Sequence, residues 1–256
     1  MDSLKIVTFN IKCDWKTDSI NSFMHRAGLV FEKVMKEMPE IILFQEIKAE
    51  HLELLRRMFP EYDFYGHFRE KDYSGEGLYT AVLKSRIQLL GYDSYWLSPT
   101  PYVPGSRFEN QSECPRICIT TKLRDKKTGK IFKTLNVHLD HISDEARIEG
   151  IKLILDRAAK EREYENIPLI IGGDFNAYPD SETIRYCNEY DKIKLHDITD
   201  KIGATFHDFG SAAVKIDYIY VTKDILPYVK STGIWDDSNA GIYLSDHYPV
   251  YAIIEN

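Results

Sequence analysis

Polar side chains stand at the ends of several apolar segments in this sequence. Four of them follow such a segment, directly or within two residues: Asn10, Glu46, His138 and Asp174. The others come at or just before the start of one: Asp217, Asp246 and His247. If the last strands run antiparallel to the earlier ones, all of these positions meet at one rim of a sheet sandwich, where side chains are held rigidly and reach solvent.

The residue types at these positions suit metal-assisted chemistry on a phosphoester. Carboxylate and amide oxygens are hard ligands, which suit Mg²⁺ or Mn²⁺ better than zinc. Histidines titrate near neutral pH, and a carboxylate such as Asp217 or Glu76 can orient each of them. Taken singly, each residue is more simply a turn former or a packed side chain. Together, a metal site, an acid, a base and orienting carboxylates describe hydrolysis of a phosphoester.

The composition is that of a globular protein and excludes several other classes. The chain has 256 residues, of which 43% are hydrophobic and 29% charged, so it is neither disordered nor fibrous. No linker or repeat divides it, and we expect one domain over residues 1–256. No apolar run approaches the roughly 20 residues of a membrane span. The first residues lack a secretory signal, so we expect a cytoplasmic location, no membrane partner and free, buried cysteines.

The net charge of −7 bears on the class of partner. A negative surface repels nucleic acid at long range, so a protein that grips DNA over its whole surface is disfavoured. Six cations do cluster between Lys122 and Lys133. We expect them on a solvated hairpin tip, although they could supply some phosphate contacts. Nothing in the sequence implies a protein partner.

Hydrophobic periodicity predicts strands and helices along the whole chain. Apolar runs predict strands at residues 4–9, 41–44, 168–171, 216–221 and 248–254. Helices are expected at 23–38, with Asn21 or Ser22 as the cap, at 49–59, and after Ser143. Two hairpins are expected, one pairing residues 77–83 with 87–96 and one pairing 117–123 with 130–137. This pattern predicts two packed sheets with helices outside.

Several features have two readings that the sequence leaves open. Residues 97–113 hold three prolines and a glycine, which exclude a regular element. This loop, with Arg107, either selects substrate or covers an edge of the fold. Asp140 and His141 either extend the site or form the turn before the next helix. Arg147 is expected in an ion pair and His207 in packing, rather than against a substrate.

The strand-end motifs resemble the endonuclease/exonuclease/phosphatase superfamily. The six matching segments occur in family order: Thr8-Phe9-Asn10-Ile11, Phe44-Gln45-Glu46, Asn136-Val137-His138-Leu139, Gly173-Asp174-Phe175-Asn176, Ile216-Asp217-Tyr218-Ile219 and Ser245-Asp246-His247-Tyr248-Pro249-Val250. One such motif is weak, but six in order are specific. The resemblance implies an α/β fold, a four-layer α/β/β/α sandwich with two mainly antiparallel central sheets. Within the superfamily the chain is most similar to an uncharacterised bacterial group.

The resemblance also implies a role for each matched residue. The metal ligands of the family correspond to Glu46, Asn10 and Asp246. The pair that positions the attacking water and the phosphate corresponds to Asp174 and Asn176. The His–Asp pair near the scissile phosphate corresponds to His247 and Asp217.

Three further matches concern the deoxyribonuclease-like branch of the superfamily. This branch has a second His–Glu pair, which His138 and Glu76 match, and a phosphate-binding arginine, which Arg116 matches. Abasic-site endonucleases carry a tyrosine in place of that histidine, so His138 argues against that branch.

We therefore expect a Mg²⁺-dependent hydrolase of phosphoester bonds, with Mn²⁺ as the other possible metal. Its expected substrate is a small phosphorylated molecule or a nucleotide, and the alternative is a DNA or RNA nuclease. A catalytically silent binding module is less expected because every matching catalytic position is filled. Metallo-β-lactamase-like and calcineurin-like hydrolases are rivals, but Asn136 stands where the former needs a histidine, and the Gly-Asn-His-Glu motif of the latter is absent.

Overall fold

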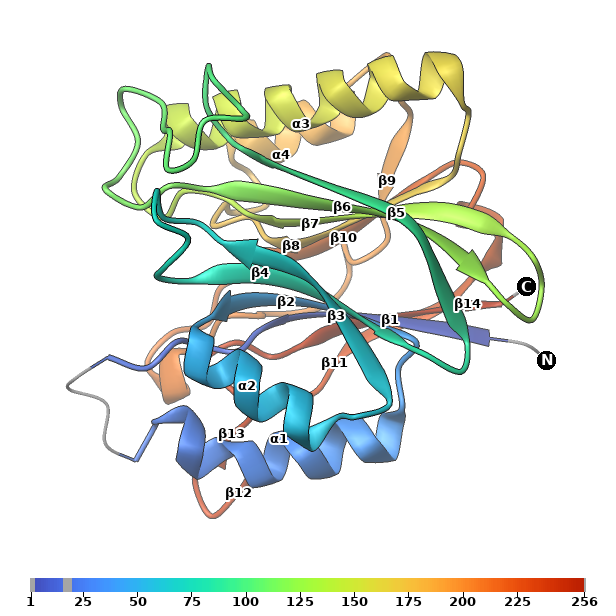
Figure 1. The fold of residues 1–256 in the computed structure, drawn as a ribbon. Coiled ribbons are helices and arrows are strands. Elements are labelled where there is room, and N and C mark those ends of the chain that lie inside the picture. The colour runs from blue at the N-terminus through green and yellow to red at the C-terminus, as the bar shows by residue number, and fades with distance from the viewer. Residues whose placement is uncertain (1–2, 16–19, 256) are drawn as a thin grey trace.

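The computed structural model describes residues 3–15 and 20–255. Two six-stranded sheets pack face to face, and helices cover the outer face of each sheet (Figure 1). The layers therefore follow one another as helix, sheet, sheet and helix. This arrangement confirms the expected α/β/β/α sandwich. Within the described part of the chain, no helix is both long and apolar enough to cross a membrane.

The first sheet has the strand order β11-β14-β1-β2-β4-β3. Its strands are β1 (Ser3–Asn10), β2 (Ile41–Ile47), β3 (Tyr62–Phe68), β4 (Gly77–Leu83), β11 (Val229–Ile234) and β14 (Val250–Glu255). Neighbouring strands are antiparallel except β1 and β2, which run parallel. Its outer face is covered by α1 (Phe23–Glu37) and α2 (Ala49–Met58).

The second sheet has the order β5-β6-β7-β8-β10-β9, and only β7 and β8 run parallel. Its strands are β5 (Ile87–Trp96), β6 (Ile117–Asp125), β7 (Ile131–His138), β8 (Leu169–Asp174), β9 (Leu195–Asp197) and β10 (Asp217–Thr222). Its outer face is covered by α3 (Asp144–Tyr164) and α4 (Glu182–Glu189). The small elements are β12 (Ser238–Asn239), β13 (Ile242–Tyr243) and two 3₁₀ turns, η1 (Asp208–Gly210) and η2 (Leu226–Tyr228).

Apolar side chains fill the three spaces between the four layers. Because successive residues of a strand point to opposite faces, Leu43 packs between the two sheets while Phe44 packs under α1 and α2. Ile219 and Tyr218 divide in the same way between the inter-sheet space and the helices of the second sheet. Both faces of the central strands are therefore buried, which explains why these strands read as continuous apolar runs.

The expected pairing of residues 77–83 with 87–96 is wrong. Both segments are strands, but β4 pairs with β2 and β3 in the first sheet, whereas β5 pairs with β6 in the second. The chain passes from one sheet to the other between Leu83 and Ile87. The missing partner of β4 is β3, a strand that hydrophobic periodicity did not reveal because its burial is only partial beyond Phe64.

The cap of α1 also differs from the expected one. Ser22 occupies the N-cap position, but its side chain caps nothing. The helix is capped instead by Asp14, whose carboxylate accepts hydrogen bonds from the backbone N–H of Phe23 at 2.7 Å and the hydroxyl of Ser22 at 3.0 Å. Local sequence preference therefore located the start of the helix, but not the residue whose side chain accepts a hydrogen bond from the free N–H group there.

The β6–β7 hairpin is confirmed, and it places the cluster of cations far from the rim where the polar strand ends meet. The rim lies at the C-terminal end of β7, whereas the turn of the hairpin precedes its first residue. At about 3.3 Å per residue, the eight residues of β7 separate the two by roughly 25 Å. Two of the cations are paired with acidic residues of α3 and its C-cap, in the Lys133–Glu161 and Lys122–Glu165 ion pairs.

Candidate active site

Strand register brings the predicted site residues together at one rim of the sandwich. In the two parallel pairs, Asn10 lies opposite Gln45 and His138 lies opposite Asp174. Across the antiparallel β8–β10 pair, Asp174 lies opposite Asp217. Because β10 and β14 run antiparallel to their neighbours, residues at their N-terminal ends reach the same rim as the C-terminal ends of the other strands.

Asn10 joins the two sheets at the centre of this rim. Its Nδ2 donates to Oε1 of Glu46 at 2.9 Å and to Oδ2 of Asp174 at 3.1 Å. The same nitrogen lies 3.5 Å from Nε2 of His247. Asn10 and Asp174 are 1% and 2% exposed, so this contact is shielded from bulk water. The site is therefore built from both sheets around one buried amide.

His247 and Asp217 form the expected pair, with 2.9 Å between Nδ1 and Oδ2. Burial alone would lower the pKa of His247, but the charge and hydrogen bond of Asp217 and the charge of Asp174 raise it well above its usual value. Burial and the charge of Asp217 raise the pKa of Asp174 to about 7, against the opposing charge of His247. The rim thus holds a cationic imidazole beside a carboxyl group that exchanges protons near neutral pH.

The expected pair of His138 and Glu76 is not formed. Glu76 binds Arg69 instead, with 2.7 Å between Nη1 and Oε2, and its other oxygen accepts from the thiol of Cys13 at 3.2 Å. Arg69 takes this carboxylate because the β3–β4 hairpin sets the two residues opposite each other, with Arg69 N donating to Glu76 O at 2.8 Å. Nε2 of His138 lies 3.5 Å from Oδ2 of Asp174.

Positive charge outweighs the one acidic neighbour of His138, Asp174. Burial and the nearby charges of Arg116, Arg69 and His247 lower the pKa of His138 well below its usual value. The imidazole of His138 is therefore neutral, whereas that of His247 is cationic. The two pKa values shift in opposite directions because His247 has Asp217 as a hydrogen-bonded partner, whereas His138 has only Asp174, which it shares with His247.

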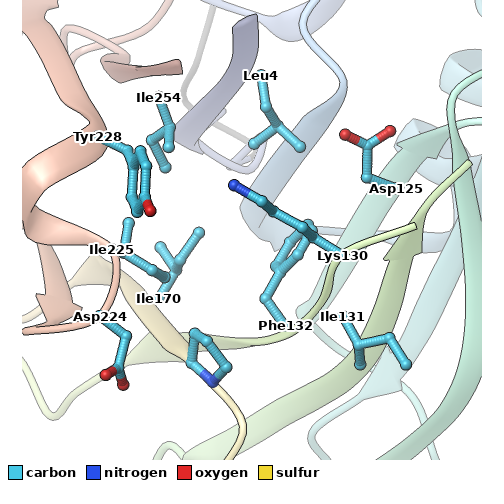
Figure 2. Close-up of a pocket in the computed structure, with 11 residues that line it drawn as sticks. Leu4, Asp125, Lys130, Ile131, Phe132, Ile170, Asp224, Ile225, Tyr228 and Ile254 are labelled. Atoms are coloured by element: carbon cyan, nitrogen blue, oxygen red, sulfur yellow. The ribbon is translucent and has the colours of Figure 1, made fainter. Parts of the chain in front are cut away.

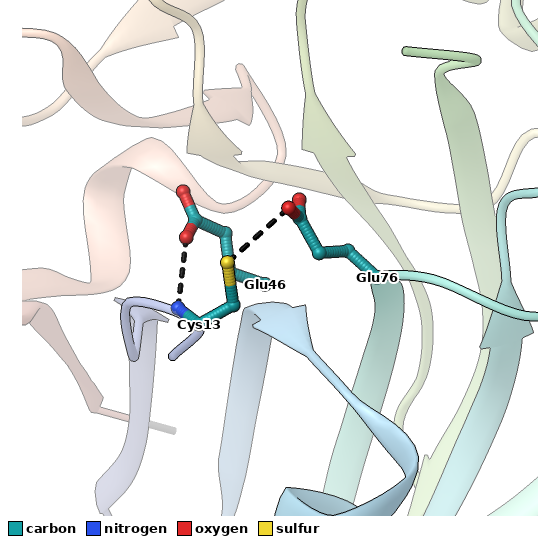
Figure 3. A group of neighbouring side chains, drawn as sticks. All are labelled: Cys13, Glu46 and Glu76. Carbon is teal, nitrogen blue, oxygen red and sulfur yellow. Dashed lines mark hydrogen bonds between the residues drawn. The ribbon is translucent and has the colours of Figure 1, made fainter. Parts of the chain in front are cut away.

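Glu46 occupies a strained position in β2. Its backbone φ is +60°, in the left-handed region that non-glycine residues rarely adopt, and the β2–β4 register shifts between Phe44 and Ile47. Such a bulge turns a side chain out of the normal alternation, and strain of this kind is commonly kept at functional sites. The carboxylate accepts from the backbone N–H of Cys13 at 2.9 Å (Figure 3). Burial opposes its ionisation, but the hydrogen bonds from Cys13 and Asn10 outweigh it and lower the pKa of Glu46.

The donor set at this rim fits a hard divalent cation. Burial raises the pKa of Asp246, as does the negative charge of Glu46, so two carboxylates repel each other in a buried site. A bound cation relieves such repulsion. Among the described residues, two groups of three potential ligands have ligand atoms within 4.8 Å of one another: Cys13, Glu46 and Glu76, and Asp174, Asp217 and His247. Glu46 belongs to the first group, and Asn10 and Asp246 interact with it through a hydrogen bond and through charge respectively.

Asn176 and Arg116, the expected phosphate-binding residues, both line the cavity at the rim. Asn176 has a left-handed φ of +47°, held by its N–H donating to Oδ1 of Asp174 at 2.8 Å, and its side-chain amide donates to Leu139 O at 3.1 Å. Arg116 is 4% exposed, and its Nη2 lies 2.8 Å from Nδ1 of His141. Nε and Nη1 of Arg116 are buried without any hydrogen-bond partner. A buried guanidinium with free N–H groups favours an anionic ligand.

The cavity between these residues has a volume of about 540 Å³. Both the predicted site residues and several apolar side chains line it. The lining includes Glu46, Arg69, Arg116, His138, Arg147, Asp174, Asn176, Phe206, Val214, Ile216, Asp246 and His247. A space of this size accommodates a small phosphorylated molecule.

A second, mostly apolar pocket of about 230 Å³ lies at the opposite end of the strands (Figure 2). Leu4 at the start of β1, Ile254 near the end of β14 and Lys130 at the hairpin line it. None of the predicted site residues lines this pocket, so it takes no part in the chemistry at the rim.

For Asp140 and His141 the sequence left open whether they extend the site or form the turn before α3. Asp140 does form the turn, because its Oδ1 accepts from the N–H groups of Ile142 and Ser143 at 3.1 and 2.8 Å. It also contacts the site, with Oδ2 3.7 Å from Nε of Arg116. His141 contacts Arg116 and lines the cavity, so it extends the site.

Arg147 and His207 are buried residues with structural contacts. Arg147 is ion-paired as expected, with Asp144, and its Nη1 donates to Asp140 O at 2.7 Å, but it also lines the cavity. His207 stacks on Tyr248 with 4.0 Å between ring centroids, which confirms packing.

The loop at residues 97–113 contributes no side chain to the cavity. Arg107 is exposed, and its Nη1 donates to Ser112 O within the loop at 2.7 Å. Ser112 in turn donates to the carboxylate of Asp140. These contacts support the interpretation in which the loop covers an edge of the fold. The loop also holds Asp140, which lies next to Arg116.

Sequence reasoning missed several residues of the cavity wall, among them Arg69, Trp15 and Tyr178. Arg69 follows β3, a strand that was itself not predicted, so no motif pointed to it. Trp15 also lines the cavity, although its side chain is 61% exposed. Arg69 can be recognised as the partner of Glu76 only once β3 and β4 are known to pair.

Comparison with known proteins agrees with this geometry. A solved structure titled endonuclease/exonuclease/phosphatase, from Bacteroides vulgatus, is 31% identical with a TM-score of 0.90, over 100% of this chain and 99% of that one. A mannosyl-6-phosphatase from Bacteroides thetaiotaomicron is 25% identical with a TM-score of 0.87, over 98% and 99%. TDP2 from D. rerio, complexed with a single-strand DNA product, is 15% identical with a TM-score of 0.76 over 100% of both chains, which shows the fold alone.

The chain matches none of the curated proteins. The model of the endonuclease/exonuclease/phosphatase family, however, matches residues 7–247. This span includes every candidate site residue from Asn10 to His247. The chain belongs to the endonuclease/exonuclease/phosphatase family.

Proposed function

We propose that the protein is a Mg²⁺-dependent hydrolase of phosphoester bonds that acts on a small phosphorylated molecule or a nucleotide. The observation that carries this proposal is the buried contact of Asn10 with Glu46, Asp174 and His247 at one rim of the cavity. It sets a carboxylate that exchanges protons near neutral pH beside a cationic imidazole and a strained glutamate.

Glu46, Asp246 and Asn10 would hold the metal. A bound Mg²⁺ supplies positive charge that polarises the phosphoryl group and neutralises the charge that develops on it. Asn10 directs its Nδ2 to Glu46 and Asp174, so its Oδ1 is the atom left for a cation, and this oxygen also accepts from Lys12 N at 3.0 Å. Mn²⁺ suits the same oxygen donors.

Asp174 is the residue placed to orient and deprotonate the attacking water. Its Oδ2 contacts Asn10, His138 and His247, at 3.1, 3.5 and 3.8 Å, and its Oδ1 is held by the N–H of Asn176. A base whose pKa lies near neutral pH is ionised for a large fraction of molecules and still accepts a proton effectively. Asn176 and Arg116 would bind the phosphoryl oxygens from the cavity wall.

The two histidines would divide the remaining work. His247 is cationic, so it can donate a proton or a charged hydrogen bond to a phosphoryl oxygen, with Asp217 holding its ring. His138 is neutral, so unlike His247 it carries no extra proton that it could donate as an acid. We therefore place His138 as a hydrogen-bond donor to the leaving group. Glu76 lines the same space but binds Arg69.

The charge distribution favours a small substrate over a nucleic acid. The net charge is −7, and the cationic hairpin lies at the far end of β7 from the site. A protein that binds a nucleic-acid strand makes several phosphate contacts near its site. The similar structure from Bacteroides thetaiotaomicron is named a mannosyl-6-phosphatase, which supports a small substrate. Nuclease action remains the alternative, and a silent binding module is disfavoured because the catalytic positions are filled.

The test measures phosphate release from small phosphoesters and cleavage of end-labelled DNA and RNA oligonucleotides, with and without Mg²⁺. The variants are Asp174→Asn and the exposed control Asp200→Asn. We expect Mg²⁺-dependent phosphate release that falls about 10²–10⁴-fold in Asp174→Asn and is unchanged in the control. Oligonucleotide cleavage that is lost in Asp174→Asn would instead establish the nuclease. A loss of less than about tenfold would remove Asp174 from the chemistry.

A further inference from the structure

Three arginines form one wall of the active-site cavity, and we call Arg69, Arg116 and Arg147 the arginine wall. They come from distant elements: Arg69 follows β3, Arg116 precedes β6, and Arg147 lies in the first turn of α3. All three line the same cavity. Their exposed fractions are only 8%, 4% and 8%, so each guanidinium is held within the fold rather than in solvent.

The arginine wall has more donors than the protein satisfies. Four of its nitrogens are buried without a hydrogen-bond partner: Nε of Arg69, Nε and Nη1 of Arg116, and Nε of Arg147. Buried charged donors are normally paired, and those that are not call for a ligand or an ordered solvent molecule. Because the three side chains line one cavity, an anion in that cavity would lie beside positive charge that the protein only partly compensates.

The carboxylates near the arginine wall bind only some of its nitrogens. Glu76 uses one oxygen for Nη1 of Arg69 and the other for the thiol of Cys13. Asp140 uses its oxygens for Ser112 and for two backbone N–H groups, and stays 3.7 Å from Nε of Arg116. Burial and the charge of Arg69 lower the pKa of Arg116, although Glu76 and Asp140 oppose this. Two guanidinium groups are thus kept close together without enough acceptors.

The scissile phosphate does not require the whole wall. In the proposed function it is bound by Arg116 and Asn176, with the two histidines beside it. Arg69 then keeps its ion pair with Glu76 and Arg147 its ion pair with Asp144, but Nε of each has no hydrogen-bond partner. Phe206, Val214 and Ile216, which also line the cavity, are apolar, so an anionic group has no favourable place beside them.

We propose that Arg69 and Arg147, which line the same cavity as Arg116, bind a second anionic group of the substrate, a phosphate or a carboxylate carried by the same molecule as the scissile phosphate. This inference rests on the proposed function and narrows its substrate class to small phosphoesters with at least two anionic groups. The uncharged part of such a molecule lies against Phe206, Val214 and Ile216.

The test measures binding rather than turnover, so it is independent of whether the enzyme is active. Isothermal titration calorimetry on the metal-free full chain compares propylphosphonate with methylenediphosphonate and propylene-1,3-diphosphonate. The variants are Arg147→Met and Arg69→Met, and Arg124→Met on the exposed hairpin is the matched control for loss of one positive charge. Thermal melting confirms that each variant is folded. Arg147→Lys keeps the positive charge but not the planar guanidinium group, and it replaces Arg147→Met in the test if that variant does not fold.

We expect at least one diphosphonate to bind wild-type protein about tenfold or more tightly than propylphosphonate. This ratio should fall below about threefold in Arg147→Met and Arg69→Met and stay unchanged in Arg124→Met. A wild-type ratio below about threefold would overturn the proposal. So would an equal weakening of mono- and diphosphonate binding in the arginine variants, because all three arginines would then serve a single phosphate. Failure of the proposed function would appear separately, as an absence of Mg²⁺-dependent phosphate release.

Discussion

Nε2 of Gln45 donates to Oδ1 of Asn136 at 2.8 Å, and this hydrogen bond joins the two sheets. Both side chains are fully buried. Asn136 also donates to the backbone carbonyls of Phe44 and Tyr79, at 3.0 and 3.3 Å. Gln45 directly precedes Glu46, and Asn136 lies two residues before His138. The contact therefore fixes the two sheets relative to each other next to the site that both of them build.

We predict that Asn136→Ala lowers the free energy of unfolding by about 2–3 kcal/mol, because it leaves a buried amide and two carbonyl groups without their partner. Urea unfolding followed by circular dichroism measures this change. The exposed substitution Asn166→Ala is the control and should change stability by less than about 0.5 kcal/mol. Equal stability of the two variants would show that the inter-sheet contact is not important for folding.

We predict that Glu46→Gln raises the Mg²⁺ concentration required for half-maximal activity by more than about tenfold. The substitution removes the negative charge that the strained β2 position directs to the rim but keeps the size of the side chain. Phosphate release is measured against Mg²⁺ concentration after treatment with a chelator. Glu163→Gln, on the exposed surface of α3, is the matched control. An unchanged Mg²⁺ requirement in Glu46→Gln would mean that another residue holds the metal.

We predict that Asp217 and His247 act as one unit. Either Asp217→Asn or His247→Ala should lower kcat by about 10²–10⁴-fold, because each removes one half of the 2.9 Å hydrogen bond that holds a charged imidazole at the rim. The double variant should lose no more than His247→Ala alone, since the aspartate then has no histidine to hold. Losses that multiply in the double variant would assign independent roles to the two residues.

We predict a pH-dependent contribution of Asp125 to stability. Burial alone would raise its pKa, but Arg86 binds both oxygens, at 2.6 and 2.8 Å, and with Lys127 N and Thr128 lowers the pKa from 3.8 to about 2. A lowered pKa in the folded state stabilises the fold above pH 3.8, and this stabilisation is lost as the pH falls through about 2.

Asp125→Asn should therefore be less stable than wild type by about 2 kcal/mol near neutral pH, with the difference disappearing close to pH 2. Urea unfolding at several pH values measures the difference between the two proteins. Glu53→Gln, which removes an exposed ion pair with Arg57, is the control and should change little. A difference that is constant with pH would contradict the role of the ion pair.

The sequence by itself determined the sandwich of two sheets and the identity of the polar residues at its rim. This was possible because the signal is local: an apolar run followed by Asn10 or Asp174 indicates a buried strand and the residue at its end. Parallel and antiparallel pairing then brings such ends together, as the opposition of Asp174 to both His138 and Asp217 shows.

Only the tertiary structure decided which side chains contact one another across the chain. Glu76 binds Arg69 rather than His138, and Asp14 rather than Ser22 caps α1, because each partner is brought in by a long-range contact that no local pattern reports. Arg69 was not recognised for the same reason, since the pairing of β3 with β4 places it in the cavity wall. Local residue type predicts where a strand ends, whereas the packing of both sheets decides what meets there.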